Sequence, residues 1–129
     1  MSAKVLIADD EPNIVLSLEF LLQNSGYVVQ TAVDGDEALR RIAEFQPDLI
    51  LLDIMLPRKN GFEVCEAIRS NPHWNDLKVV MLTAKGRESE VSKGYALGAD
   101  AYVTKPFATR DLLTSVQRLL TQKRQLSRR

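Results

Sequence analysis

The chain has 129 residues, of which 45% are hydrophobic and 26% are charged, and its 17 basic residues balance its 17 acidic ones. This length fits one domain with a sizeable core, and the balanced charge argues against the strongly basic surface of a nucleic-acid-binding protein. No apolar run approaches the ~20 residues of a membrane-spanning helix, so we expect a cytoplasmic protein without a membrane segment.

The first part of the chain predicts a strand, a helix and a second strand. Residues 4–8 and 27–32 are short apolar runs typical of strands. Between these runs, apolar residues recur at helical spacing over residues 14–22. Pro12 suits the first turn of this helix, and Gly26 suits its C-terminal end.

A second helix leads to the strand around which the rest of the chain is arranged. Asp34 and Glu37 have the spacing of a capping box at the start of this helix, and Pro47 follows its end. Residues 49–52 are consecutive apolar residues without alternation, a pattern typical of a strand buried on both faces. Asp53 ends this run, so we expect a carboxylate at the carboxyl end of a central strand.

A third helix follows the loop after Asp53. Phe62, Cys65 and Ile68 share one helical face, and the Asn71-Pro72 pair ends the helix. This placement makes the chain's single cysteine a packing residue rather than a metal ligand or redox group.

The remaining elements are two strands and two helices. Residues 78–83 predict a fourth strand, and a charged loop at residues 85–88 leads to a weakly amphipathic helix that ends at Gly98. We expect this helix to be the least firmly held. Residues 101–104 predict the last strand, and Thr109 is the expected N-cap of a strongly apolar final helix.

Regular alternation of strands and helices predicts a doubly wound, three-layer α/β domain with parallel strands joined by right-handed crossovers. All loops from strand to helix then lie at one edge of the sheet, which brings together Asp9, Asp10, Asp53, Thr83 and Lys105. Carboxylates so close repel one another, and a hard divalent cation, magnesium above all, relieves this repulsion. With one carboxylate as nucleophile and a hydroxyl and an ammonium opposite, these residues indicate an aspartyl-phosphate site.

Short motifs follow four separate strands: Asp9-Asp10, Asp53, Thr83-Ala84 and Lys105-Pro106-Phe107. Through them the chain resembles, from residue 4 to about residue 120, the receiver domain of two-component response regulators of the chemotaxis-regulator type. The resemblance implies a flavodoxin-like five-stranded sheet in the order 2-1-3-4-5. It also implies a receiver domain over residues 1–121, which leaves residues 122–129 as a basic tail or the start of a linker.

The resemblance further assigns roles at the acidic edge. Asp53 is the residue that a histidine kinase or a phosphotransfer protein phosphorylates. Asp10, Asp53 and the backbone carbonyl of Met55 hold Mg²⁺ or Mn²⁺, and Asp9 helps through water. The receiver is then a signalling domain that assists its own phosphorylation and dephosphorylation rather than an enzyme.

The same resemblance gives the residues that bind the phosphoryl group and transmit the signal. Thr83 and Lys105 bind the phosphoryl oxygens, and the Lys105–Pro106 peptide bond is cis. Tyr102 is the aromatic switch that swings inward as the Thr83 hydroxyl moves. The switched surface surrounds the fourth helix, the fifth strand and the fifth helix. A downstream protein or a covalently linked output domain reads it, without direct contact between this domain and nucleic acid or membrane.

Other classes of function share parts of this pattern. Phosphatases of the haloacid dehalogenase type need a second acid two residues after the nucleophile, where this chain has Met55. A nucleotide or flavin site on the same fold needs a glycine-rich loop after the first strand, where the chain has Asp9-Asp10-Glu11. A phosphate-independent interaction scaffold would be favoured by loss of Asp53 or Lys105, and both are present.

Overall fold

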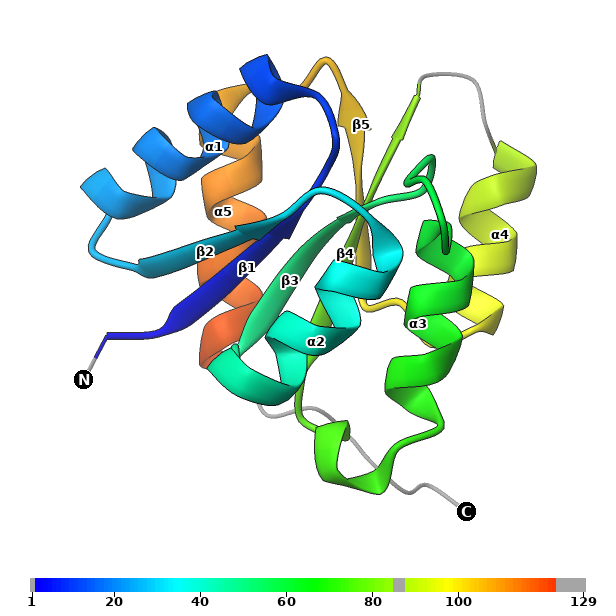
Figure 1. Cartoon of the computed structure of the whole chain (residues 1–129). Helices are drawn as coiled ribbons and strands as arrows, with labels where there is room; N and C mark the ends of the chain where they lie inside the picture. The colour runs from blue at the N-terminus through cyan, green and yellow to red at the C-terminus, as the bar shows by residue number, and fades with distance from the viewer. Residues whose placement is uncertain (1, 85–87, 123–129) are drawn as a thin grey trace.

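Parallel strands form one sheet in the order β2-β1-β3-β4-β5 in the computed structural model, which describes residues 2–84 and 88–122 (Figure 1). This order confirms the predicted flavodoxin-like fold. The strands are β1 (Lys4–Ala8), β2 (Val28–Ala32), β3 (Leu49–Asp53), β4 (Lys78–Ala84) and β5 (Ala101–Lys105).

The central strand is β3, which pairs with β1 on one side and β4 on the other. All five of its residues are buried, and Leu49, Ile50, Leu51 and Leu52 are 0% exposed. A run without alternation therefore marks a strand covered on both faces, as the sequence predicted.

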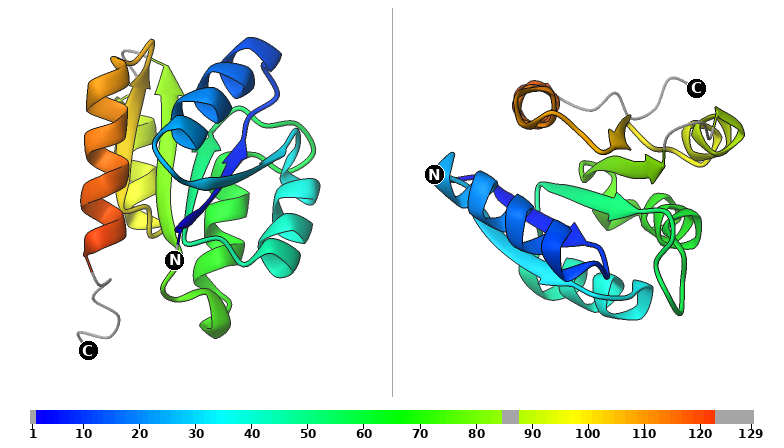
Figure 2. Two further views of the ribbon diagram at one scale, coloured as in Figure 1. Left: turned by 90° about the vertical axis from the view of Figure 1, so that its left-hand side faces the viewer. Right: turned by 90° about the horizontal axis from the view of Figure 1, so that it is seen from above.

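Helices cover both faces of the sheet and complete three layers (Figure 2). One apolar cluster joins the sheet to α1 and α5, and a second joins its other face to α2 and α3. The helices are α1 (Pro12–Asn24), α2 (Gly35–Phe45), α3 (Gly61–Arg69), α4 (Glu88–Ala96) and α5 (Thr109–Thr121). None of the described helices is long and apolar enough to cross a membrane.

Local chemistry explains the ends of the first two helices. Pro12 lies in the first turn of α1, and Gly26 follows its end with φ +94°, a conformation that favours glycine. At the start of α2 the Asp34 side chain accepts a hydrogen bond from the Glu37 N–H. The Glu37 carboxylate accepts from the N–H of Val33 rather than from that of Asp34, so half of the expected capping box forms.

Three local predictions need correction. Helix α5 begins one residue earlier than expected, so Ala108, not Thr109, is its N-cap, and the alanine side chain has no atom that could accept a capping hydrogen bond. The segment after α3, expected to be a loop, contains a 3₁₀ turn, η1 (Pro72–Trp74), because the Asn71 side chain accepts from the His73 N–H. Both β4 and β5 extend one residue further, and their last pair is Ala84 with Lys105.

Two predictions lie partly outside the described residues. The expected charged loop at residues 85–88 includes residues 85–87, which the structure does not describe, and α4 begins at Glu88. Helix α5 ends at Thr121, and nearly all of the expected tail at residues 122–129 lies beyond the described part.

Basic side chains close helix ends at the edge of the sheet where the strands begin, which we call the amino edge. The Lys4 Nζ donates to the carbonyl of Phe45, the last residue of α2, at 2.8 Å. The Lys78 Nζ donates to the Leu119 carbonyl at 2.7 Å and also to the Gln122 carbonyl at the end of α5. These ammonium groups donate to carbonyls at the ends of α2 and α5, and the Leu119 carbonyl also accepts from the Gln122 N–H at 3.3 Å.

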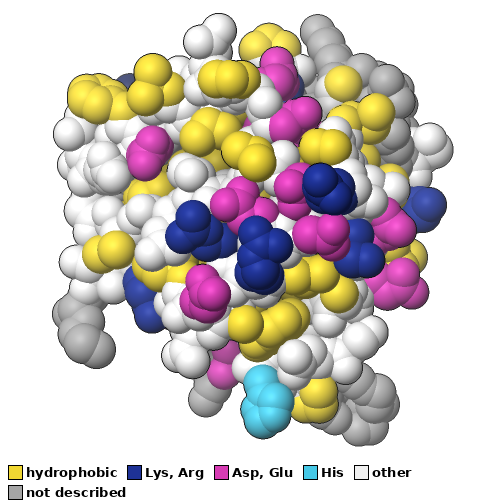
Figure 3. All heavy atoms as spheres, viewed as in Figure 1, with side chains coloured by type: hydrophobic (Ala, Val, Ile, Leu, Met, Phe, Trp, Pro, Cys, Tyr) yellow, Lys and Arg dark blue, Asp and Glu magenta, His cyan; other side chains and the backbone are white. Residues whose placement is uncertain are grey.

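The face of the molecule in Figure 3 carries acidic and basic side chains interspersed with one another. Hydrophobic side chains gather on the same face over α1, where Leu16 and Phe20 are each 67% exposed. The mixture of signs on this face matches the balanced charge of the sequence.

Candidate functional site

Three carboxylates meet at the opposite edge of the sheet, the carboxyl edge. Asp9 follows the last residue of β1, and Asp53 is the last residue of β3. The register pairs Ala8 with Leu52, so Asp9 and Asp53 lie next to each other on adjacent strands. Asp9, Asp10 and Asp53 each offer a carboxylate oxygen within 4.8 Å of the others.

Burial and repulsion act most strongly on Asp53. Asp9 is 0% and Asp53 is 5% exposed. Burial raises the pKa of the Asp53 carboxyl, and the charges of Asp9 and, less strongly, Asp10 raise it further. The Lys105 charge and the Met55 N–H act in the opposite direction without cancelling the rise in pKa. The ionised form of Asp53 is therefore costly in this environment.

This donor set fits a hard divalent cation. Mg²⁺ and Mn²⁺ prefer carboxylate and carbonyl oxygens, and Mg²⁺ is commonly held by one or two carboxylates together with water. Asp10 is exposed and Asp53 lies deeper, so the cluster opens toward solvent on one side. A cation there would remove the repulsion that raises the pKa of Asp53.

Lys105 is the ammonium that the described residues place beside these carboxylates. Its Nζ lies 2.8 Å from Asp9 Oδ2, 3.1 Å from Glu11 Oε1 and 3.5 Å from Asp53 Oδ2. Burial alone would lower the pKa of this ammonium, but the hydrogen bond to Asp9 and the charge of Asp53 outweigh burial and raise the pKa. The Lys105–Pro106 peptide bond is cis, the geometry expected for it.

Glu11 is a contact that sequence reasoning missed. In the sequence analysis Glu11 has no role of its own, yet its carboxylate accepts a hydrogen bond from Lys105, 94 residues away in the chain. The available signal was the unbroken run of three acids facing a lysine at the end of the last strand.

Thr83 and Met55 flank Asp53. Thr83 is 4% exposed, and because Leu82 pairs with Asp53, Thr83 lies one step beyond Asp53 along β4. The Met55 N–H donates to Asp53 Oδ1 at 3.2 Å, which closes a turn around the carboxylate. The Met55 side chain is 66% exposed.

Gly61 is a second residue that the sequence did not indicate. A Cβ at this position would lie 2.7 Å from the Asp53 carbonyl oxygen, too close for any larger residue. The Gly61 N–H also donates to the Ile54 carbonyl at 2.9 Å. The first residue of α3 thus holds the backbone that follows Asp53.

Tyr102 does not belong to the acidic cluster. It is half-buried on β5 and lies beside Tyr95 of α4, with ring centroids 4.9 Å apart. Of the other predicted side chains, Asp9, Asp10, Asp53 and Lys105 come together directly, and Thr83 lies one step beyond Asp53 along β4.

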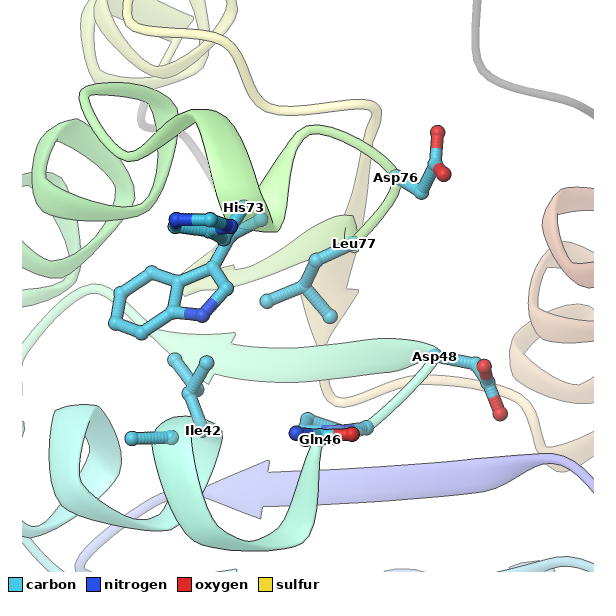
Figure 4. Close-up of a pocket in the computed structure, with 9 residues that line it drawn as sticks. Ile42, Gln46, Asp48, His73, Asp76 and Leu77 are labelled. Atoms are coloured by element: carbon cyan, nitrogen blue, oxygen red, sulfur yellow. The ribbon is translucent and has the colours of Figure 1, made fainter.

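A cavity of about 340 Å³ lies far from this cluster, between the end of α2, the start of β3 and η1 (Figure 4). Ile42 and Leu77 give it apolar walls, and Asp48 and Asp76 lie to one side of it. None of the residues predicted for the acidic site lines it. This cavity therefore takes no part in the chemistry of the carboxyl edge.

Comparison with known proteins gives one consistent result. Residues 5–117 match the family model of the response regulator receiver domain. A protein assigned as a response regulator in Chloroflexus aurantiacus J-10-fl is 34% identical, with a TM-score of 0.91 over 95% of this chain and 100% of that one.

Two further solved structures agree. The chemotaxis response regulator CheY4 of Vibrio cholerae is 35% identical, with a TM-score of 0.87 over 92% of this chain and 99% of that one. The receiver domain of NtrX from Brucella abortus is 30% identical, with a TM-score of 0.84 over 92% and 99% of the two chains.

Proposed function

Because this chain belongs to the response regulator receiver family, we propose that it accepts a phosphoryl group on Asp53 in a magnesium-dependent reaction. The observation that carries the proposal is the convergence of three carboxylates and the Lys105 ammonium at one edge of the sheet. Receiver domains are signalling domains, so the product is a changed surface rather than a released compound.

The environment of each carboxylate favours Asp53 as the acceptor. Asp9 is fully buried, with Oδ1 accepting from the Glu11 N–H and Oδ2 accepting from Lys105. Asp10 is exposed at the approach to α1, away from the centre of the sheet. Asp53 keeps one oxygen fixed by the Met55 N–H and the other 3.5 Å from Lys105. An Asp53 oxygen forms a bond to phosphorus as the bond from phosphorus to the donor breaks.

The cation is assigned to Asp10, Asp53 and the Met55 backbone carbonyl, with Asp9 acting through water. When bound, Mg²⁺ or Mn²⁺ neutralises charge on the phosphoryl oxygens. Its carboxylate ligands are oxygens that already repel one another, so binding also stabilises the folded protein.

Lys105 and Thr83 are assigned to the phosphoryl oxygens. Lys105 is held by Asp9 and Glu11 at present, and its Nζ has to shift only from these oxygens toward Asp53. Thr83 is buried one step beyond Asp53, and its hydroxyl would donate to a phosphoryl oxygen. Tyr102 then turns inward as the Thr83 hydroxyl moves, and the surface of α4, β5 and α5 changes.

The partners follow from this assignment. A sensor histidine kinase or a histidine phosphotransfer protein supplies the phosphoryl group in the cytoplasm. A downstream protein or a covalently linked output domain reads the changed surface, while the domain itself binds neither nucleic acid nor membrane. The functional unit spans residues 1–121, and residues 122–129 form a basic tail or the start of a linker.

Two alternatives are less well supported. A haloacid-dehalogenase-like phosphatase needs a general acid two residues after the nucleophile, and Met55 has no such group. A phosphate-independent scaffold has no need for a half-buried ammonium beside a buried carboxylate, an arrangement that costs desolvation energy.

Intact-mass measurement after incubation with acetyl phosphate tests the proposal. We expect one added phosphoryl group with magnesium, none in excess EDTA, and none in Asp53→Asn. Asp76→Asn, at an exposed aspartate near the amino edge, is the matched control and should label as the wild type does. Labelling of Asp53→Asn to the wild-type level would refute the assignment, and steady turnover of a chromogenic phosphoester would favour the phosphatase.

A further inference from the structure

The Tyr102 ring lies against helix α4. Tyr102 pairs with Met81 across β4 and β5, and both residues pack in the core cluster that includes residues of α3. On α4 the ring meets two consecutive residues, buried Gly94 and half-exposed Tyr95. The two tyrosine rings are tilted by 55° with centroids 4.9 Å apart, within the range of favourable aromatic pairs.

Gly94 leaves the space that the Tyr102 ring fills. A Cβ added at this position would overlap the Tyr102 hydroxyl oxygen and lie 2.5 Å from the ring carbon Cζ. Non-bonded carbon atoms stay about 3.5 Å apart or more, so any larger residue here displaces the ring. Glycine in a helix interior is less stable than alanine. The contact with the Tyr102 ring gives a reason for glycine at this position, because alanine would not leave room for the ring.

Tyr102 also lies near the end of β4 that carries Thr83. Met81 and Thr83 project to the same face of the sheet because they are two residues apart on one strand, about 6.6 Å along it. Since Met81 is the register partner of Tyr102, the ring lies between α4 and the part of the sheet next to Thr83. If the Tyr102 ring moves away from Gly94 while its backbone stays paired in β5, the ring can turn toward Thr83.

Polar contacts hold the chain just after the end of α4, and one side-chain contact joins the helix itself to α3. The Arg69 Nε donates to the Gly98 carbonyl at 2.9 Å, and the Arg69 guanidinium pairs with Asp100 at 2.8 Å. Lys93 contacts α3 through a cation–π interaction with the Phe62 ring at 4.7 Å. The contact between α4 and Tyr102 lies before the Arg69 anchor in the chain, within the helix itself.

We propose that Gly94 and Tyr95 form a seat on α4 that holds Tyr102 in its present position. Withdrawal of the ring from this seat and displacement of α4 are then one event, and Gly94 is the positioning residue that makes the seated state accessible. The coupling of this ring movement to Asp53 rests on the proposed function. The seat itself does not, and it can be tested without phosphorylation.

Fluorine NMR of protein labelled with 3-fluorotyrosine tests the seat directly. The chain has three tyrosines, Tyr27, Tyr95 and Tyr102, and single Tyr→Phe variants assign their resonances. Without magnesium or phosphoryl donor, we expect Gly94→Ala to move the Tyr102 resonance and leave that of Tyr27 in place. A Tyr102 resonance unchanged in Gly94→Ala would overturn the proposal.

Thermal unfolding separates the clash from helix propensity. With Tyr102→Ala as background, Gly94→Ala should raise Tm by about 3 to 5 °C because alanine favours the helix. With Tyr102 present, the rise should be absent or reversed. Ser92→Ala on the same helix is the matched control, since serine already has a Cβ and Ser92 is exposed. Equal rises in both backgrounds would show that the ring does not occupy the space at Gly94.

Binding of beryllofluoride with magnesium, a mimic of the phosphoryl group on Asp53, tests the coupling. Gly94→Ala should bind the mimic at least about 5-fold more tightly than wild type, because the ring has already left the seated state. If the Tyr102 resonance moves in Gly94→Ala but the affinity for beryllofluoride stays at the wild-type value, the position of the ring is not coupled to Asp53, and this part of the proposal is wrong. If wild type binds no mimic, the proposed function fails, while the fluorine spectra still decide whether the seat exists.

Discussion

The two edges of the sheet surround a lysine ammonium with different partners. At the amino edge, Lys78 is 7% exposed and donates to neutral carbonyls at the end of α5. At the carboxyl edge, Lys105 meets the carboxylates of Asp9, Glu11 and Asp53. The first arrangement satisfies helix dipoles and stabilises the fold. The second keeps carboxylates close enough to repel one another, so stability is lower there and a cation is favoured.

Magnesium should produce the largest effect in this comparison. At about 100 times its dissociation constant, it should raise the free energy of unfolding by about 2.7 kcal/mol, because it binds only the folded carboxyl edge. Urea unfolding with magnesium and with EDTA measures the difference. Asp10→Asn should lose most of the gain, and Asp76→Asn should keep it. A gain that survives in Asp10→Asn would place the cation elsewhere.

Removal of the Lys78 ammonium at the amino edge should have the second-largest effect on the free energy of unfolding. Lys78→Met keeps the length of the side chain but leaves the Leu119 and Gln122 carbonyls without their charged donor. We expect a loss of about 2 kcal/mol in the free energy of unfolding and no change in phosphoryl labelling. Lys4→Met is the matched control at the end of α2, and its loss should be smaller because Lys4 is less buried. An unchanged midpoint for Lys78→Met would show that these carbonyls are equally well satisfied by water.

Neutralising the acceptor should stabilise the protein when no cation is present. The folded-state pKa of Asp53 is raised by burial and by Asp9, so its ionised form weakens the fold. In EDTA at pH 7, Asp53→Asn should raise the free energy of unfolding, as urea unfolding would measure.

The difference in the free energy of unfolding between Asp53→Asn and the wild type should increase as the pH rises. A carboxyl with a raised folded-state pKa favours the folded state below its unfolded value, near 3.8, and loses that contribution as pH rises through the folded-state pKa. The advantage of Asp53→Asn should therefore be small at pH 4 and grow toward pH 7. An advantage that shrinks as pH rises would mean that Asp53 is stabilised, not destabilised, by its surroundings.

The smallest effect belongs to Glu11. Its side chain is 62% exposed, and Lys105 retains Asp9 and Asp53 without it. Glu11→Gln should change the free energy of unfolding by about 0.5 kcal/mol or less. A loss above about 1.5 kcal/mol in urea unfolding would show that Glu11 is a main anchor of Lys105.

The sequence predicts the features that a single strand and the residue at its end determine, namely which strand is central and which acids lie at the carboxyl edge. The unalternated run at residues 49–52 identifies β3 as central, and an acid after each of two buried strands brings Asp9 and Asp53 together. The link from Glu11 to Lys105 and the space that Gly94 leaves for Tyr102 are contacts between separate elements. No local pattern encodes such contacts, because they depend on how helices and strands pack.

Smaller misses have local reasons. Thr109 is a good capping residue, but the backbone enters the helix one position earlier, at Ala108. Glu37 has the spacing of a capping box, yet its carboxylate reaches the N–H of Val33. In each case the residue types were informative and the position was displaced by one.

Direct chemical mapping of the acceptor tests the central claim. After labelling with acetyl phosphate and magnesium, borohydride reduces an aspartyl phosphate to homoserine with release of phosphate, and peptide mass spectrometry locates the reduced residue. The account predicts homoserine at position 53, lost when magnesium is withheld. Homoserine at position 9 or 10 with none at 53 would contradict it.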